Sequence, residues 1–225
     1  MECPQCGKDV AVVPVPGAGR ERFDLHDEDS GKPCWASYAW VDLATLDTEN
    51  RFTDPTEACP HPERWTAADC QAPEHEVTAL VAAFVTALRP DLVVETGTAW
   101  GQTAKAIGWA LRGTGGVLHT VEPNPECCSQ ARWVCRDLPV KVHQTESLSF
   151  VPPGPVGFAW LDSLSDLRIP EVRHLLPHFT PGAIVGIHDT ADHQGDLWAQ
   201  VVAAEAEGLL LPIRLPTPRG VVFAE

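Results

Sequence analysis

From residue 73 onward, the chain alternates between short apolar runs and longer segments with helical spacing. Residues 73–90 carry apolar side chains at positions i, i+3, i+4 and i+7, which predicts an amphipathic helix that ends at Pro90. The last two apolar runs are joined only by Pro-Thr-Pro-Arg, which predicts an antiparallel hairpin. The other predicted strands are 92–95, 117–122, 140–145, 156–162 and 183–190, and the other predicted helices are 102–112, 125–137, 169–179 and 197–207.

Strands that alternate with helices are typical of a parallel sheet covered by helices. We therefore expect residues 73–225 to form an α/β domain. It would have a Rossmann-like parallel sheet, helices on both faces and a C-terminal antiparallel hairpin. Residues 35–72 are rich in Pro, Asp, Glu and Thr, with several aromatic residues between them. Two interpretations stay open for this segment: a linker that packs on the main domain, or a lid over a substrate pocket.

Residues 1–34 have the layout of a small zinc ribbon. Cys3 and Cys6 form a Cys-x-x-Cys knuckle, the following segment reads as a hairpin, and His26 and Cys34 come after it. We therefore predict a zinc-ribbon-like segment in which Cys3, Cys6, His26 and Cys34 hold a structural Zn²⁺ ion. Cys59, His61 and Cys70 are alternative ligands, and a terminus that binds no metal is the simpler alternative.

The formal net charge of −15 changes the expected range of partners. Nucleic acid would be repelled over most of such a surface, and the 16 basic residues form no local patch in the sequence. The chain has neither an 18-residue apolar run nor an apolar N-terminal stretch, so we expect a cytoplasmic protein without a membrane segment. Cysteines in such a compartment favour metal binding or buried thiols, and we expect the latter for Cys127, Cys128 and Cys135.

The strand at 92–95 enters a glycine turn that carries the strongest functional signal. Glu95 ends the apolar run, Gly97 and Gly101 follow, and a helical pattern begins near Gln102. In open α/β sheets, the first turn from strand to helix is where nucleotide-like cofactors bind. A dinucleotide dehydrogenase would require Gly-x-Gly-x-x-Gly, whereas this loop is Gly-x-x-x-Gly after an acid, which disfavours hydride transfer.

The ordered motifs over residues 73–225 resemble those of class I S-adenosylmethionine (SAM)-dependent methyltransferases, most closely small-molecule O-methyltransferases. The resemblance rests on E-T-G-T-A-W-G at 95–101, V-E-P at 121–123, W-L-D at 160–162, the run at 175–190 that ends in His-Asp-Thr, and the closing T-P-R-G-V-V-F. It implies SAM as the cofactor and O-methylation of a hydroxyl group on a small molecule or a sugar. Nucleic acid is disfavoured as a partner, and a homodimer is left open.

The resemblance also assigns cofactor contacts. The glycines would let the backbone approach the methionine end of SAM, and the helix N-terminus near Gln102 would face its carboxylate. Glu95 would accept from the amino group, Glu122 would hold the ribose hydroxyls and Ser147 would meet the adenine. The predicted cofactor residues are Glu95, Gly97, Thr98, Ala99, Gly101, Gln102, Thr103, Glu122, Pro123, Ser147 and Asp162.

For the chemical step, Asp162, His188 and Asp189 are the predicted catalytic residues, because they follow neighbouring strands of the expected sheet. Similar O-methyltransferases hold a divalent cation such as Mg²⁺ with an aspartate after the fourth strand and an Asp-Asn pair after the fifth. Here the pair is Asp189-Thr190, so two interpretations stay open: a cation at Asp162 and Asp189, or a metal-free site with His188 as general base.

Two other functions remain as alternatives. The first is a zinc-ribbon module that recruits a protein partner on a degenerate methyltransferase scaffold. The second is a nucleic-acid methyltransferase, which the acidic charge and the missing Asn/Asp-Pro-Pro-Tyr/Phe signature oppose.

Overall fold

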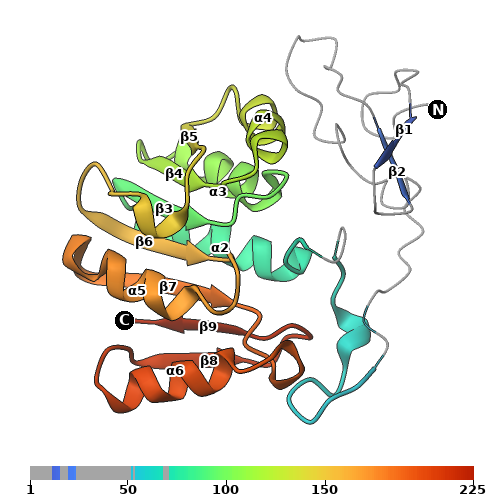
Figure 1. Cartoon of the computed structure of the whole chain (residues 1–225), viewed down its shortest axis with the longest axis vertical. Helices are drawn as coiled ribbons and strands as arrows, with labels where there is room; N and C mark the ends of the chain where they lie inside the picture. The colour runs from blue at the N-terminus through green and yellow to red at the C-terminus, as the bar shows by residue number, and fades with distance from the viewer. Residues whose placement is uncertain (1–11, 16–19, 24–51, 53, 68–70) are drawn as a thin grey trace.

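The computed structural model describes residues 12–15, 20–23, 52, 54–67 and 71–225, with 12–15 and 20–23 described as backbone only (Figure 1). Most of the described chain forms one seven-stranded sheet with the order β5-β4-β3-β6-β7-β9-β8. The sheet is parallel except for β9, which pairs antiparallel with both β7 and β8. Its strands are β3 (Leu92–Thr96), β4 (Val117–Val121), β5 (Val140–His143), β6 (Val156–Leu161), β7 (Phe179–His188), β8 (Pro212–Leu215) and β9 (Val221–Ala224).

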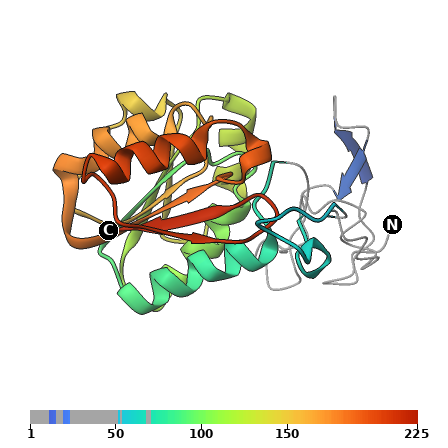
Figure 2. The same cartoon turned by 90° about the horizontal axis from the view of Figure 1, so that it is seen from below.

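Helices cover both faces of this sheet, as Figure 2 shows with α5 and α6 on one side and α2 on the other. The α-helices are α2 (His75–Leu88), α3 (Gln102–Arg112), α4 (Pro125–Val134), α5 (Arg168–Leu175) and α6 (Leu197–Ala206). Valines and leucines of the strands alternate between two buried clusters, one under α2 and α3 and one under α5 and α6. This confirms the predicted Rossmann-like α/β fold with a C-terminal antiparallel hairpin.

The main difference from the sequence prediction lies between α5 and β7. The α-helix ends at Leu175 and continues as a short 3-10 turn, Leu176–His178, because Pro177 has no N–H for the helical ladder. Strand β7 begins at Phe179, four residues earlier than predicted, and its pairing with β6 shifts register near Gly182, whose φ is 76°. A glycine at positive φ permits this irregularity without steric cost.

The segment ahead of the sheet is described in part. Strands β1 (Val12–Val15) and β2 (Arg20–Phe23) pair antiparallel, which confirms the hairpin expected there. The predicted zinc ligands Cys3, Cys6, His26 and Cys34 lie outside the described residues, as does Cys70. Near α2, Ala67 forms an isolated antiparallel bridge with Glu74. No helix in the described ranges combines the length and the apolarity that crossing a membrane requires.

Candidate functional site

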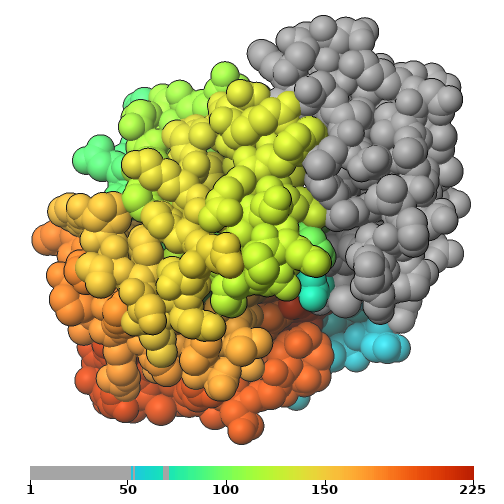
Figure 3. Space-filling view, turned by 45° about the horizontal axis from the view of Figure 1, so that its top comes forward, coloured from blue at the N-terminus to red at the C-terminus, as the bar shows by residue number. Residues whose placement is uncertain are grey.

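A cavity of about 500 Å³ opens at the carboxyl ends of β3, β4, β6 and β7. In Figure 3 it corresponds to the hollow between the yellow-green residues around α4 and the orange residues around α5. The sheet order changes direction here, because the chain adds β4 and β5 on one side of β3 and β6 and β7 on the other. Such a switch point is where open α/β sheets bind ligands.

Backbone geometry at Gly97 explains why the loop after β3 needs glycine. Its φ is 78°, and a Cβ atom there would lie 2.3 Å from the carbonyl oxygen of Asp162. Only glycine permits so close an approach of the loop to the end of β6. Gly101 is also at positive φ (83°) and is the N-cap of α3. At Gly97 the loop therefore brings backbone, without a side chain, to one wall of the cavity.

The N-terminus of α3 faces the same wall. Gln102 and Thr103 line the cavity, the first turn contains no acidic residue, and no side chain caps it. The first N–H groups of a helix have no intrahelical partner and lie at the positive end of the helix dipole. This wall therefore suits a ligand carboxylate or another small anion.

Glu122, immediately after β4, presents a fixed carboxylate to the cavity. Its two oxygens accept hydrogen bonds from the backbone N–H groups of Ala99 and Asn124, each at 2.9 Å. Each oxygen keeps a second lone pair, so the oriented carboxylate can still accept hydrogen bonds from a pair of ligand hydroxyls. Pro123 and Ser147 line the same end of the cavity.

Glu95 is placed differently from the sequence expectation. Its side chain is buried and outside the cavity lining, and the hydroxyl of Thr120 donates a hydrogen bond to it. Burial raises the pKa of Glu95 to about 8, so the group is mainly protonated at neutral pH. Gly101 also lies outside the lining, whereas the other predicted cofactor residues are part of it: Gly97, Thr98, Ala99, Gln102, Thr103, Glu122, Pro123, Ser147 and Asp162.

The opposite end of the cavity is built on a network of ion pairs. Three carboxylates alternate with three basic groups in this cluster, which we call the strand-end network. Its members are Glu74, Asp162, Asp189, Arg168, His188 and Arg219. They come from the N-cap of α2, the ends of β6 and β7, the first residue of α5 and the turn before β9. Distant parts of the chain therefore meet at one point.

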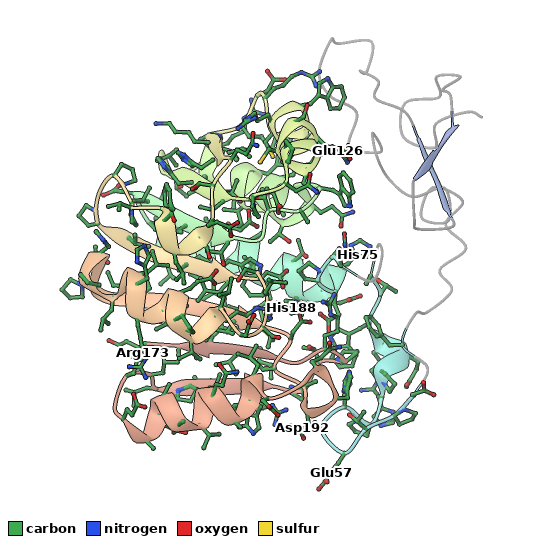
Figure 4. All side chains as sticks on the ribbon, in the orientation of Figure 1. Glu57, His75, Glu126, Arg173, His188 and Asp192 are labelled. Atoms are coloured by element: carbon green, nitrogen blue, oxygen red, sulfur yellow. The ribbon has the colours of Figure 1, made fainter. Side chains whose placement is uncertain are left out.

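His188 lies at the centre of this network and is fully buried (Figure 4). Its Nδ1 is 3.0 Å from Asp162 Oδ1 and its Nε2 is 2.8 Å from Glu74 Oε2. Burial alone would lower the pKa of His188, but Asp162, Glu74 and Asp189 outweigh it and raise the pKa to about 9. The imidazole is therefore charged at neutral pH, with both nitrogens donating. In this state the ring has no free lone pair, which argues against His188 as a general base.

The strand-end network also bears on whether the site could hold a divalent cation. Within the described part of the chain, Asp162, His188 and Asp189 form the one cluster of metal-type donors. The guanidinium of Arg168 already bridges its two carboxylates, with Nη2 2.8 Å from Asp189 Oδ2 and 3.2 Å from Asp162 Oδ1. Thr190 is fully buried and outside the cavity lining. These residues do not fit a Mg²⁺ ion, which argues against the cation interpretation.

Sequence reasoning missed three members of the network: Glu74, Arg168 and Arg219. Arg168 comes six residues after Asp162, in a segment with no recognised motif. Glu74 stands in the irregular segment before α2. Only Arg219 carried a signal, since it belongs to the closing T-P-R-G motif. Residues 71–73 also line the cavity.

The cysteines of α4 are buried, as predicted. Cys127 lines the cavity near Glu122, and Cys128 and Cys135 lie in the interior. Burial raises the pKa of all three thiols, that of Cys127 to about 11 and that of Cys135 to about 12. Among the alternative zinc ligands, Cys59 is buried, whereas His61 is exposed and forms a hydrogen bond with Glu63.

Comparison with known proteins shows similarity at the level of the fold. No family model and no curated protein matches the chain. Among solved structures, it is similar to the methyltransferase PaMTH1 from Podospora anserina, bound to SAH. The TM-score is 0.61 at 16% identity, covering 82% of this chain and 94% of that one.

Two further structures show the same fold. The O-methyltransferase TomG from Streptomyces achromogenes, in complex with SAM, gives a TM-score of 0.60 at 18% identity over 82% of this chain and 94% of that one. The O-methyltransferase from Bacillus cereus, in complex with SAH, gives a TM-score of 0.60 at 15% identity over 69% and 82%. The sheet and its helices therefore define a class I methyltransferase fold.

Proposed function

We propose that this protein is a SAM-dependent O-methyltransferase that acts on a hydroxyl group of a small molecule. The observation that carries the proposal is the pairing of two binding features on one cavity. The glycine loop and the N-terminus of α3 suit the amino-acid end of SAM, and the oriented carboxylate of Glu122 suits its ribose. The fold shared with structures that hold SAM or SAH supports it.

The acceptor would bind at the end of the cavity formed by residues 71–73 and the strand-end network. Trp100, Leu164 and Leu167 are among the apolar residues that line the cavity, and Leu164 is 69% exposed. An apolar side chain that lies open at a cavity mouth loses water contact when a ligand covers it. We therefore propose a small acceptor with an apolar body, which this lining favours over a sugar.

Methyl transfer breaks the S–CH₃ bond of the sulfonium, forms the O–CH₃ bond and releases the hydroxyl proton. Alignment of the oxygen with the methyl carbon contributes most to such a step. Asp162 is the group that we propose as the proton acceptor. Its Oδ1 accepts from Arg168 and His188, whereas no described residue donates to Oδ2, and the side chain lines the cavity. Asp189 is then a positioning residue, since Arg168 and Arg219 engage both of its oxygens.

Calorimetric titration with S-adenosylhomocysteine tests the proposal. The wild-type protein should bind, and Glu122→Gln should weaken binding about tenfold or more, because a charge-assisted hydrogen bond to the ribose is lost. Glu126→Gln is the matched control, since Glu126 is an exposed acid in the first turn of α4 and should leave affinity unchanged. Absence of binding by the folded wild-type protein would refute the proposal.

The protein-partner and nucleic-acid alternatives of the sequence stay open as proposals, and no described residue favours either. A structural Zn²⁺ ion near the N-terminus is likewise a proposal that rests on the cysteine spacing. A homodimer likewise stays a proposal.

A further inference from the structure

The guanidinium of Arg168 is unusually well enclosed for a charged group. Arg168 is 2% exposed, is the first residue of α5 and lines the cavity. Besides its contacts with Asp162 and Asp189, Nε and Nη2 donate to the carbonyl oxygen of Ser163 at 3.1 and 2.6 Å. Nη1 donates to the carbonyl oxygen of His188. A buried guanidinium needs this many acceptors, because its desolvation is costly.

The Arg168 guanidinium lies between the carboxylates of Asp162, after β6, and Asp189, after β7. A divalent cation bound by Asp162 and Asp189 would have to take the same oxygens and the same space as Nη2. The charges of the network also cancel: the negative charges of Glu74, Asp162 and Asp189 balance the positive charges of Arg168, His188 and Arg219. Two additional positive charges in this buried cluster would have no counter-charge, which is unfavourable in a low-dielectric site.

We propose that Arg168 is a built-in cation that occupies the position of a divalent metal and makes the acceptor end of the site independent of metal. Arg168 acts as a positioning residue: it fixes the carboxylate planes of Asp162 and Asp189, as a metal ion would, and leaves Asp162 Oδ2 for the acceptor. That positioning role rests on the proposed methyltransferase function. The exclusion of metal does not, since it follows from the ion pairs alone.

Removal of the Arg168 side chain should therefore create a metal-binding site. Arg168→Ala leaves an uncompensated negative charge and an empty space between two carboxylates, the donor set that hard divalent cations prefer. Mn²⁺ is the suitable probe, because it favours oxygen ligands over the thiolates of the N-terminal cysteines and is detected directly by electron paramagnetic resonance. Arg173→Ala is the matched control: Arg173 lies on the same helix but forms an exposed ion pair with Glu207.

We expect no Mn²⁺ binding by the wild-type protein or by Arg173→Ala. Arg168→Ala should bind about one ion per chain, and the double variant Arg168→Ala/Asp189→Asn should lose it. If circular dichroism shows that Arg168→Ala is unfolded, Arg168→Gln replaces it in the same comparison. A wild-type protein whose bound Mn²⁺ disappears in Asp189→Asn would overturn the inference, as would a folded Arg168 variant that binds no ion.

Cofactor binding separates this inference from the proposed function. Titration with S-adenosylhomocysteine should give the same affinity for wild-type protein with and without chelator. Failure to bind S-adenosylhomocysteine at all would remove the methyltransferase proposal and leave the Mn²⁺ result intact. Binding that requires a divalent ion at Asp189 would instead overturn the metal-independent site.

Discussion

At the scale of single residues, the site depends on groups held in states that they would not adopt in water. His188 is a buried imidazolium, Glu95 is a carboxylic acid with a pKa of about 8, and Asp189 has a left-handed backbone with φ of 59°. For Asp189, burial alone would raise the pKa, but His188, Arg168 and Arg219 outweigh it and lower the pKa to about 2. The fold maintains each state through neighbours that are distant in the sequence.

Gly97 offers a residue-scale test of the loop. Gly97→Ala should destabilise the protein by several kcal/mol, because strain at positive φ costs roughly 1–3 kcal/mol and the new Cβ would also collide with the carbonyl of Asp162. It should also abolish binding of S-adenosylhomocysteine. Gly115→Ala is the control: φ is similar (86°), but the new Cβ would have no atom within 4 Å, so the free energy of unfolding should fall only by the backbone strain. Urea unfolding and calorimetry measure both effects, and equal losses for the two variants would contradict this account.

His188 predicts a pH dependence of stability. Its pKa is raised from 6.5 to about 9, so the folded protein binds this proton more tightly than the unfolded chain. The stabilisation is complete below pH 6.5 and is lost as the pH rises to about 9, on the order of 3 kcal/mol in total. The free energy of unfolding in urea should therefore fall between pH 6.5 and 9. His188→Gln should be less stable at pH 6.5 and should lack this decline, and an unchanged decline in the variant would refute the assignment.

At the scale of elements, the structure connects the segment before α2 to the end of the chain. Glu74, the N-cap of α2, accepts from the backbone N–H of Arg219, and Arg219 donates to the carbonyl of Ala72. The turn before β9 therefore holds residues 71–74 at the cavity wall. This contact gives residues 71–73 a defined place in the site, which the open linker-or-lid interpretation left undecided.

The zinc prediction belongs to the N-terminal element. If Cys3, Cys6, His26 and Cys34 hold a Zn²⁺ ion, elemental analysis of the purified protein should give about one zinc per chain. Cys3→Ser should lower this content, because one of four ligands is lost. Cys127→Ser is the control, since Cys127 lies in the described cavity far from that segment in sequence, and its zinc content should be unchanged. Protein without zinc, purified with no chelator present, would contradict the prediction.

At the scale of the whole molecule, local patterns predicted the order of strands and helices well. Strands β3, β4, β5 and β6 lie within one or two residues of their predicted bounds, because each is a short apolar run between polar turns. The predicted bounds were wrong where a tertiary contact overrides the local pattern, as at the start of β7. There, pairing with β6 extends the strand through Pro181 and Gly182, two residues that disfavour strands.

Local sequence patterns predicted the fold and most of the residues at the end of the cavity where we propose that SAM binds. The glycine turn, the N-terminus of α3 and Glu122 belong to one strand-helix-strand unit, so their spacing already indicates how they meet. The contacts at the opposite end, where we propose that the acceptor binds, depend on the tertiary structure. Glu74 and His188 are 114 positions apart, and Arg168 reaches Asp189 across two elements. No local spacing encodes such pairings, and our proposals for His188 as a charged group and for Arg168 in place of a metal ion rest on them.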